Sequence, residues 1–474
     1  MPTPLGRSIQ DYSQKSILRL HMPGHIGGKE LLPPLREAAP YDLTEIPGLD
    51  DLHQPQAGIK QAKEYIASCF GAEESFILVN GASSGIHALM LAAGSVGDKI
   101  LLPRNVHRSF YGALVMSGAD PLYMPCTINS SLGMAVSLYP STVEDYLNRY
   151  ADIQAVFITS PSYFGTCAQV EQIAALVHKR DIPLMVDEAH GAHFSFHSAY
   201  PRPALEQGAD AAVNGLHKTL PVLTPGAVLH MASSFPAPET LRAAWSLLTT
   251  TSPSYLLMAS IEWGVAYMET QGQALLEQAR ELSCEYQKKI SQIPGLQCMG
   301  EEFIQEESIQ AVDPLKVVVA IWEWSLNGQQ LDALLRSRYG IQVEMAENNF
   351  ILAMFSLLHK REDWEMFYQA LLDLSRSYYR PGRGKKLVEN PPLPQVIFNP
   401  RQAFFANKER VGLKEARGRI AGELVAAYPP GIPCVLPGEQ MNAGVIDYLE
   451  YVQKSGVRIQ GPADPTLQTI QVIS

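Results

Sequence analysis

Between about residue 57 and residue 230, short apolar runs alternate with amphipathic segments of helical spacing. Short apolar runs are typical of buried strands, and helical spacing of apolar positions indicates helices that cover a sheet. The alternation therefore predicts an α/β fold with a doubly wound, mostly parallel sheet. We expect strands at 75–79, 99–103, 155–159, 182–186, 210–214 and 227–230, with helices at 57–70, 86–93 and 170–179.

The pattern changes on either side of this region. Gly and Pro interrupt residues 1–56, which predicts loops or an arm there, and long helical patterns fill 256–293. A new strand-helix-strand unit is expected at 316–324, 329–338 and 350–357, before a basic, proline-rich linker around residues 380–394. The resulting division is an N-terminal arm with active-site loops (1–56), a large domain (57–310), a small α/β domain (311–380) and a C-terminal domain (395–474).

Composition narrows the class of protein. The chain has 474 residues, 46% of them hydrophobic and 18% charged, which is ordinary for a globular protein of more than one domain. Its net charge of −11 argues against nucleic acid as a partner. The six cysteines include no CxxC pair, which suits a reducing cytoplasm and predicts no metal site. No apolar run is long enough to cross a bilayer, so we expect no membrane partner.

Asp187 and Lys218 are the residues around which the chain is organised. Asp187 ends the apolar run at 182–186, and Lys218 follows the weaker strand at 210–214. Ligands bind beyond the carboxyl ends of strands in open α/β sheets, so both side chains can reach one crevice. A lysine can form a Schiff base with pyridoxal phosphate (PLP), and a carboxylate can keep the pyridine nitrogen protonated. A helix-capping Asp and a surface Lys are the alternative interpretation.

The turn at 80–85 allows two interpretations. It consists largely of small residues and joins a strand to a helix, and the free N–H groups and dipole of a helix N-terminus favour phosphate. The same turn contains Gly81-Ala82-Ser83-Ser84-Gly85, which matches the G-x-S-x-G of a hydrolase nucleophile elbow. In a hydrolase Ser83 would be the nucleophile, and Asp187 with His190 or His193 would follow in the expected order.

Motifs spread over nearly the whole chain resemble one family, the ornithine, lysine and arginine decarboxylases in their short bacterial form. The resemblance implies a PLP-dependent enzyme of fold type I, with an aspartate aminotransferase-like large domain and a smaller α+β C-terminal part. The matching stretches are HMPGHIGG, LDDLH, NGASSG, PRNVHRS, PSYFGT, VDEAHGAH, HKTLP, TTSPSYLLMAS and YPPGIPCVLPGE.

The resemblance also implies roles for single residues. Lys218 would be the Schiff-base lysine, Asp187 the partner of the pyridine nitrogen, and His107 the imidazole stacked on the cofactor ring. With His217, these residues are the expected catalytic group. Further cofactor contacts are expected from Ser83, Ser84 and His217 at the phosphate, from His190, and from Thr251 and Ser252 at a neighbouring subunit's phosphate.

Two consequences follow from these implied roles. Because Thr251 and Ser252 would complete another subunit's site, we expect a homodimer or a larger homo-oligomer with shared active sites. One departure from the family concerns Gly215, where many relatives have Ser. One phosphate hydroxyl is then missing, and whether Thr219 replaces it stays open.

The expected reaction is decarboxylation of a basic L-amino acid (arginine, lysine or ornithine) to agmatine, cadaverine or putrescine and CO2. Another PLP reaction such as transamination stays open, because Arg401, Arg417 or Arg419 could clamp an α-carboxylate. The hydrolase alternative leaves Lys218 and His107 without a role. A basic side chain needs a carboxylate partner, and the candidates are Glu45, Asp50, Asp51, Glu344, Glu347 and, as first choice because of its turn-rich motif, Glu439.

Overall fold

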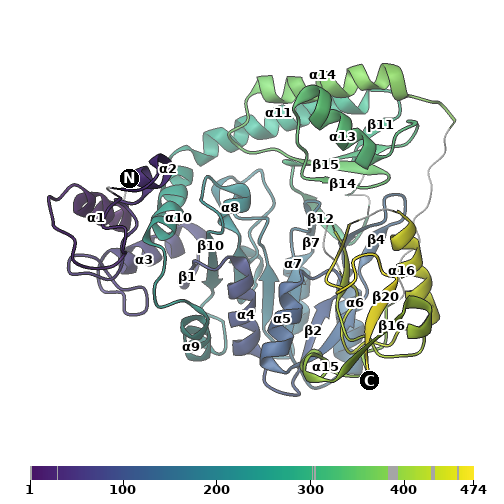
Figure 1. Ribbon diagram of the computed structural model, residues 1–474, viewed down its shortest axis with the longest axis horizontal. Helices are drawn as coiled ribbons and strands as arrows, with labels where there is room; N and C mark the ends of the chain where they lie inside the picture. Colours follow the sequence, from purple (N-terminus) through teal and green to yellow (C-terminus); the bar gives the residue numbers. More distant parts are fainter. Residues whose placement is uncertain are drawn as a thin grey trace. The chain divides into compact units, whose positions relative to one another are not determined.

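The computed structural model describes residues 3–28, 30–300, 303, 306–382, 393–428, 433–455 and 458–474 (Figure 1). The chain divides into two compact units, each made of two pieces of sequence. Unit 1 comprises Met1–Ala92 and Met185–Leu276, and unit 2 comprises Ala93–Leu184 and Glu277–Ser474.

Unit 1 is built on a mixed sheet with the strand order β1-β10-β9-β8. β8 and β9 are parallel, with Asp187 opposite Val213, whereas β10 runs antiparallel to both β9 and β1. The apolar runs thus form strands where the sequence predicted them, and the mostly parallel arrangement is confirmed. β1 runs in the same direction as β8 and β9, and among these four strands only β10 is reversed. The strands are β1 (Glu74–Leu78), β8 (Leu184–Asp187), β9 (Ala211–Asn214) and β10 (Ala227–Met231).

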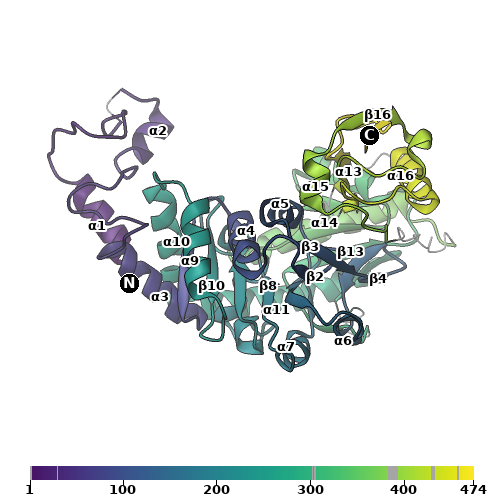
Figure 2. The same cartoon turned by 90° about the horizontal axis from the view of Figure 1, so that it is seen from below.

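Helices surround this sheet, and two of them lie within residues 1–56, where we expected loops or an arm. α1 buries Leu5, Ile9 and Tyr12 along one face and lies beside α3 and α10 (Figure 2). Three apolar residues in so short a segment do not distinguish a helix from a loop in the sequence. The helices of unit 1 are α1 (Pro4–Ser13), α2 (Pro33–Ala38), α3 (Gly58–Phe70), α4 (Ala82–Ala93), α8 (Leu216–Thr219), α9 (Pro238–Leu248), α10 (Tyr255–Tyr267), the short turns η1 (Phe194–Phe196) and η2 (Leu205–Gln207), and the π-helical η3 (Met268–Gly272).

The carboxyl group of Glu262 anchors α1 to α10. Its Oε1 accepts the N–H of Leu5 at 3.1 Å, and its Oε2 accepts the N–H of Gly6 at 2.7 Å. These N–H groups belong to the first turn of α1, where no intrahelical acceptor exists. The Glu262 side chain is fully buried, and burial raises its pKa to about 7. Gly6 packs so closely on Trp263 that a Cβ would lie 2.1 Å from the indole nitrogen.

Unit 2 contains a parallel group of strands and a separate antiparallel sheet. The strands β6-β2-β3 are parallel, and the antiparallel sheet has the order β11-β13-β15-β14. The first part of the unit comprises β2 (Lys99–Pro103), α5 (Ser109–Ser117), β3 (Asp120–Met124), β4 (Thr127–Asn129), β5 (Met134–Ser137), α6 (Pro140–Arg149), β6 (Ile153–Thr159), β7 (Thr166–Ala168) and α7 (Val170–His178).

The antiparallel sheet is covered on one face by helices, as Figure 1 shows for α11, α13 and α14. Along β13, Val317 and Val319 face the helices, whereas Val318 and Ala320 face the opposite core, because successive side chains of a strand alternate. The hydrophobic core between this sheet and its helices includes residues of α11 and β11. Both elements precede residue 311, where the sequence predicted the small domain to begin, and that boundary stays a prediction. The elements are α11 (Gln273–Ser291), β11 (Leu296–Cys298), β12 (Ile309–Val312), β13 (Lys316–Ile321), α13 (Gly328–Tyr339), β14 (Met345–Ala346), β15 (Phe350–Met354) and α14 (Arg361–Tyr378).

The C-terminal part of unit 2 has a core of its own. β16 pairs with β20, β17 pairs with both β18 and β19, and α16 packs on the same core. Most of the predicted linker, residues 383–392, and residues 429–432 of the YPPGIP motif lie outside the described residues. The elements are α15 (Pro400–Phe405), β16 (Lys408–Gly412), η4 (Leu413–Ala416), β17 (Val425–Tyr428), β18 (Pro433–Val435), α16 (Ala443–Ser455), β19 (Arg458–Gln460) and β20 (Thr469–Ile473).

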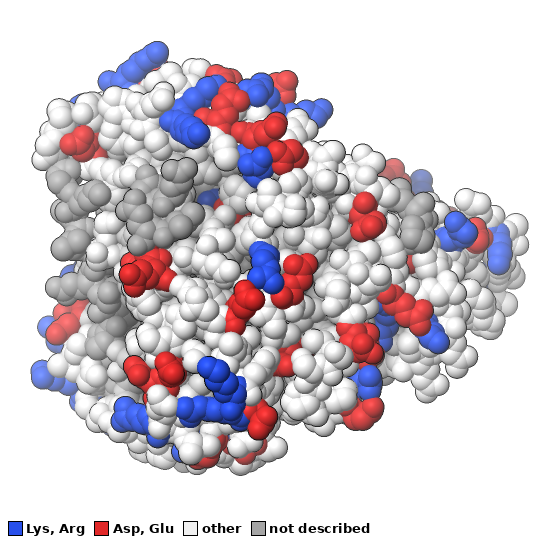
Figure 3. Space-filling model, turned by 180° about the vertical axis from the view of Figure 1, so that it is seen from behind, with Lys and Arg blue, Asp and Glu red and all other residues white. Residues whose placement is uncertain are grey.

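Two global properties bear on possible partners. In the part of the chain that the structure describes, no helix is both long and apolar enough to cross a membrane. Lys and Arg are interspersed with Asp and Glu on the face that Figure 3 draws, where neither sign forms a continuous field. An interspersed surface gives no electrostatic reason to expect a phosphate backbone on this face.

The anchoring of α1 should weaken as pH rises. The pKa of Glu262 in the folded state lies above the ordinary carboxyl value of 4.5, so its contribution is fully present below that value and is lost as pH rises through about 7. We expect the free energy of opening of α1 to fall by about 1–3 kcal/mol between pH 5 and pH 8. Glu262→Gln should remove this dependence, whereas the exposed control Glu64→Gln should keep it. Hydrogen exchange of residues 3–13 measures the opening, and the same pH dependence in Glu262→Gln would assign it to another group.

Candidate active site

Asp187 stands at the carboxyl end of β8, where the sequence placed it. Its side chain is 6% exposed, and Oδ1 accepts the N–H of Ala189 at 3.2 Å. Asp187 pairs with Val213 in the parallel pair of β8 and β9, so the segments that follow the two strands start side by side. The carboxylate is therefore held at the edge from which Lys218 also projects.

Lys218 lies in α8, a single helical turn that follows β9 after Gly215. Its Nζ is 3.1 Å from Nε2 of His190, so the two side chains share a hydrogen bond. His190 follows β8 by three residues, as Lys218 follows β9 by four. The structure therefore brings Asp187, His190 and Lys218 to one edge of the unit 1 sheet.

His217 is held by the loop that precedes β10. Its Nδ1–H donates to the carbonyl of Gly226 at 2.9 Å, and its backbone N–H donates to the same carbonyl at 3.1 Å. Burial, assisted by the charge of Lys218, lowers the pKa of His217, so the neutral ring is favoured. With the proton on Nδ1, Nε2 accepts rather than donates, and binding a phosphate through Nε2 would require a second proton. The role of His217 stays a prediction.

Gly215 and Thr219 flank the lysine within the same turn. A Cβ at Gly215 would lie 2.9 Å from the carbonyl oxygen of Ala189 and 3.3 Å from Cδ of Lys218, so a serine there would crowd the lysine. The hydroxyl of Thr219 is buried and has no hydrogen-bond partner among the described residues. A buried hydroxyl without a partner is costly, and a ligand oxygen would satisfy it.

The turn after β1 has the form of a phosphate site. Gly81 adopts φ +78°, and α4 begins at the next residue. The Ser84 hydroxyl donates to the Gly81 carbonyl at 2.8 Å, which stabilises the turn. At Gly85 a Cβ would lie 2.7 Å from Leu78, so glycine lets α4 pack closely on the sheet. No hydrogen bond joins Ser83 to a histidine among the described residues, which leaves the hydrolase interpretation without its general base.

Thr251 and Ser252 lie in the exposed loop between α9 and α10. The loop is held by His53, whose Nε2–H donates to the Thr250 carbonyl at 3.0 Å. The other ring nitrogen of His53 is 3.1 Å from the hydroxyl of Ser246, at the end of α9. The two predicted phosphate ligands therefore belong to an ordered loop that faces away from the core of unit 1.

His107 belongs to unit 2, in the loop that joins β2 to α5. Its Nδ1 accepts the N–H of Ser109 at 3.2 Å and lies 3.0 Å from the Ser109 hydroxyl. An accepting Nδ1 places the proton of the neutral ring on Nε2. Its predicted stacking on the cofactor ring stays a prediction.

The carboxylate of Glu439 already has a strong partner. Its side chain is 1% exposed, and Oε2 accepts from Nη2 of Arg104 at 2.8 Å while Oε1 accepts from Nη1. Oε2 also accepts the N–H of Leu436 at 2.8 Å. Breaking a buried ion pair costs about 3–5 kcal/mol, so this carboxylate is committed to the structure. The substrate role predicted for Glu439 stays a prediction that these contacts do not favour.

Other candidate carboxylates also accept hydrogen bonds, Asp51 from the N–H of His53 and Glu45 from the hydroxyl of Thr44 among them. Asp50 accepts backbone N–H groups of residues 51–60 and thereby caps α3, and these hydrogen bonds lower its pKa against the opposing effect of burial. Glu344 accepts the hydroxyl of Tyr163. For Glu347, burial raises the pKa to about 7. The contact of Glu344 with Tyr163 could not be read from the sequence, because the two residues are 181 positions apart.

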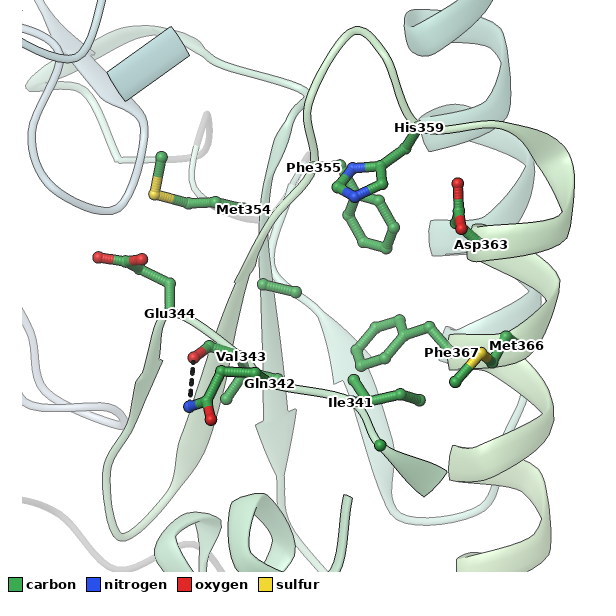
Figure 4. Close-up of a pocket in the computed structure, with 12 residues that line it drawn as sticks. Ile341, Gln342, Val343, Glu344, Met354, Phe355, His359, Asp363, Met366 and Phe367 are labelled. Atoms are coloured by element: carbon green, nitrogen blue, oxygen red, sulfur yellow. Dashed lines mark hydrogen bonds between the residues drawn. The ribbon is translucent and has the colours of Figure 1, made fainter. Parts of the chain in front are cut away.

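A cavity with a volume of about 350 Å³ lies in unit 2 beside β15 and α14, and Figure 4 draws the residues that line it. Its apolar lining includes Ile341, Phe355 and Phe367, with His359 and Asp363 next to them. None of the residues predicted to bind PLP lines this cavity. Asp363 accepts the Lys360 N–H at the start of α14, which is a structural role.

The residues at the edge of unit 1 fit PLP. Lys218 offers an amine for the aldehyde, and the buried Asp187 offers a carboxylate for a pyridinium nitrogen. The N-terminus of α4 and the Thr219 hydroxyl without a partner suit a phosphate.

Sequence reasoning missed the supporting residues of this edge, chiefly His53, Glu188 and Asn214. The LDDLH motif that contains His53 was recognised without a role, and the structure shows that it holds the loop at 250–252. Glu188 and Asn214 carried no sequence signal beyond their neighbours Asp187 and Gly215, because their hydrogen bonds join segments 26 residues apart.

Comparison with known proteins gives one consistent result. Residues 3–363 match the family model of the Orn/Lys/Arg decarboxylase major domain, and residues 385–464 match its C-terminal domain. The chain is 35% identical to an arginine decarboxylase of Bacillus anthracis over 99% of this chain and 97% of that protein. It is 34% identical to an arginine decarboxylase of Bacillus subtilis over 99% and 98%. The structure is similar to the lysine decarboxylase LdcF of Francisella novicida, with a TM-score of 0.84, 20% identity and coverage of 100% of this chain and 81% of that one.

The buried hydroxyl of Thr219 leads to a test of cofactor binding. We expect Thr219→Val to weaken PLP binding by about 10- to 100-fold, because a hydrogen bond to a charged group contributes about 1.5–3 kcal/mol. Thr219→Ser keeps the hydroxyl and should bind PLP as the unaltered protein does. Titration of the apoprotein with PLP, followed by visible absorbance, measures the dissociation constant. Equal affinity for the valine variant would place this hydroxyl away from the phosphate.

Proposed function

This chain belongs to the Orn/Lys/Arg decarboxylase family of PLP-dependent enzymes, and we propose that it converts L-arginine to agmatine and CO2. The observation that carries the proposal is the pairing of Lys218 and His190 beside the buried carboxylate of Asp187 at one sheet edge. When bound there, PLP supplies an electron sink for the electron pair released as CO2 leaves.

The residues at this edge have distinct tasks in such a reaction. Asp187 holds the proton on the pyridine nitrogen, because a buried carboxylate next to that nitrogen favours its charged form. Lys218 holds the cofactor through its amine. After CO2 leaves, the α-carbon needs a proton, and the hydrogen-bonded pair of Lys218 and His190 is the carrier placed to supply it.

Two of the three arginines that could serve a transaminase, Arg401 and Arg419 but not the exposed Arg417, have structural partners, and this supports decarboxylation over transamination. A transaminase of this fold would need an arginine to hold the α-carboxylate. Arg401 donates to the carbonyl of Met116 at 2.9 Å, and Arg419 pairs with Glu409 and donates to the carbonyl of Ile473 at 3.2 Å. Both guanidinium groups therefore have structural partners within unit 2.

Arginine is our choice of substrate because the relatives of matching length carry that name. The Bacillus arginine decarboxylases share 34% and 35% of their residues with this chain over nearly its whole length, whereas LdcF shares 20%. We also place the protein in the cytoplasm, in agreement with six cysteines that form no disulfide among the described residues.

A direct assay tests the substrate. Purified protein saturated with PLP should release CO2 and agmatine from L-arginine, with kcat/KM at least about tenfold above L-lysine and L-ornithine, because a site shaped for a planar guanidinium fits an ammonium poorly. Lys218→Ala should release none. Asp187→Asn is the sharper variant, since it should keep bound cofactor and lose most turnover. Faster formation of cadaverine or putrescine would contradict the arginine assignment, and formation of a keto acid without CO2 would contradict decarboxylation.

We further propose that the protein is a homodimer with shared active sites. The segment 17–35 exposes a series of large apolar side chains, which a second copy of the chain would cover. Exposed apolar residues so close in sequence are unusual in a monomer. They are Ile17, Leu18, Leu20, Met22, Ile26, Leu32 and Leu35.

Subunit mixing tests the shared sites. Lys218→Ala and the double variant Thr251→Ala/Ser252→Ala should each have little activity alone. In a mixed dimer one of the two sites receives an intact Lys218 from one chain and intact hydroxyls from the other. Random exchange makes half of the dimers mixed, so about a quarter of the unaltered activity should return. Demonstrated exchange without recovery would refute the shared site, and a sedimentation mass of one chain would refute the dimer.

A further inference from the structure

Glu188 lies between Asp187, which ends β8, and His190 in the loop that follows. The proposed reaction gives roles to Asp187 and His190 but none to Glu188. Its side chain is 4% exposed. Oε1 accepts the N–H of Ala204 at 2.8 Å, and Oε2 accepts from Nδ2 of Asn214 at 3.2 Å. The same amide nitrogen donates to the backbone carbonyl of Glu188 at 3.0 Å. Asn214 thus contacts both the backbone and the side chain of Glu188.

These contacts lie where the strand pairing stops. The register of β8 and β9 ends with Asp187 opposite Val213, and the next residues on the two chains are Glu188 and Asn214. The N–H of Gly215 then donates to the carbonyl of Ala189 at 3.2 Å. Hydrogen bonds between the two segments therefore continue beyond the end of the sheet as far as His190 and Lys218, whose side-chain nitrogens are 3.1 Å apart.

We propose that Glu188 is a positioning residue for decarboxylation: with Asn214, it fixes the separation between the carboxylate of Asp187 and the amine of Lys218. The proposal rests on the proposed function, because that function is what requires the two groups to act on one cofactor. Without these hydrogen bonds Lys218 could move relative to Asp187. A small displacement of reacting groups from the productive geometry lowers the reaction rate strongly. The contact with Ala204 holds Glu188 itself in place from the opposite side.

The charge of Glu188 is consistent with this role. Burial raises its pKa to about 8, and the nearby charge of Glu206 acts in the same direction, whereas the donors Ala204 and Asn214 oppose the shift. A neutral Glu188 places no second negative charge beside Asp187. The full negative charge of Asp187 is then available for a pyridinium nitrogen.

Glu188→Ala removes the acceptor, and Asn214→Ala the donor, of the side-chain hydrogen bond between these two residues. In each variant we expect kcat to fall by about 10- to 100-fold while KM stays within about twofold, since positioning is lost and binding is kept. The pH midpoint of the visible absorbance of the PLP-loaded protein should shift in the same direction in both. The double variant should be no worse than either single one, because both act through one contact. If Glu188→Ala does not fold, Glu188→Asp and Asn214→Ala give the same comparison.

Ser234→Ala is the matched control, because its hydrogen bond lies near the opposite end of β9. The Ser234 hydroxyl donates to Oδ1 of Asp210 at 2.6 Å, next to the opposite end of β9. Its loss should lower the melting temperature but leave kcat and the spectral midpoint unchanged. Unaltered kcat and midpoint in folded Glu188 and Asn214 variants would overturn the positioning role while leaving the proposed function intact. If the unaltered protein releases no CO2 from any basic amino acid, the proposed function fails, and a common spectral shift would still support the positioning role.

Discussion

The parallel pairing of β8 with β9 is the constraint on which the candidate active site depends. Asp187 pairs with Val213, so the chains that carry His190 and Lys218 leave the sheet at the same edge. A shift of the pairing by one residue would turn the Asp187 side chain to the other face of the sheet. The buried, apolar run of β8 makes such a shift unfavourable, because every side chain of the strand would change its surroundings.

Burial favours the neutral form of several titratable groups in unit 1. It raises the pKa of Glu188 to about 8, lowers the pKa of His217, and lowers that of His230 in β10 to about 3. At neutral pH these groups carry no charge in their favoured forms. The opposite charges that PLP chemistry needs are thereby left to Asp187 and Lys218.

Small residues set how closely the parts of this edge approach one another. Gly85 brings α4 against Leu78 of β1, and Gly215 leaves room between the carbonyl of Ala189 and the side chain of Lys218. The absence of a side chain at Gly215 therefore has a steric reason. The buried hydroxyl of Thr219 lies four residues further along the same turn and remains the group that could serve a phosphate in its place.

The sequence by itself determined where the strands lie and which residues end them. The run at 99–103 became β2 with the same bounds, Asp187 ends a strand and Lys218 follows one as predicted, because buried strands need apolar side chains whatever their neighbours are. Strand direction was left to the tertiary structure, since an apolar run such as β10 is equally apolar in either direction. The partner of Glu439 was also beyond the sequence, because Arg104 is 335 residues away. Only folding decides which distant groups meet, and with it whether a carboxyl group such as that of Glu188 is buried, neutral and bound to Asn214.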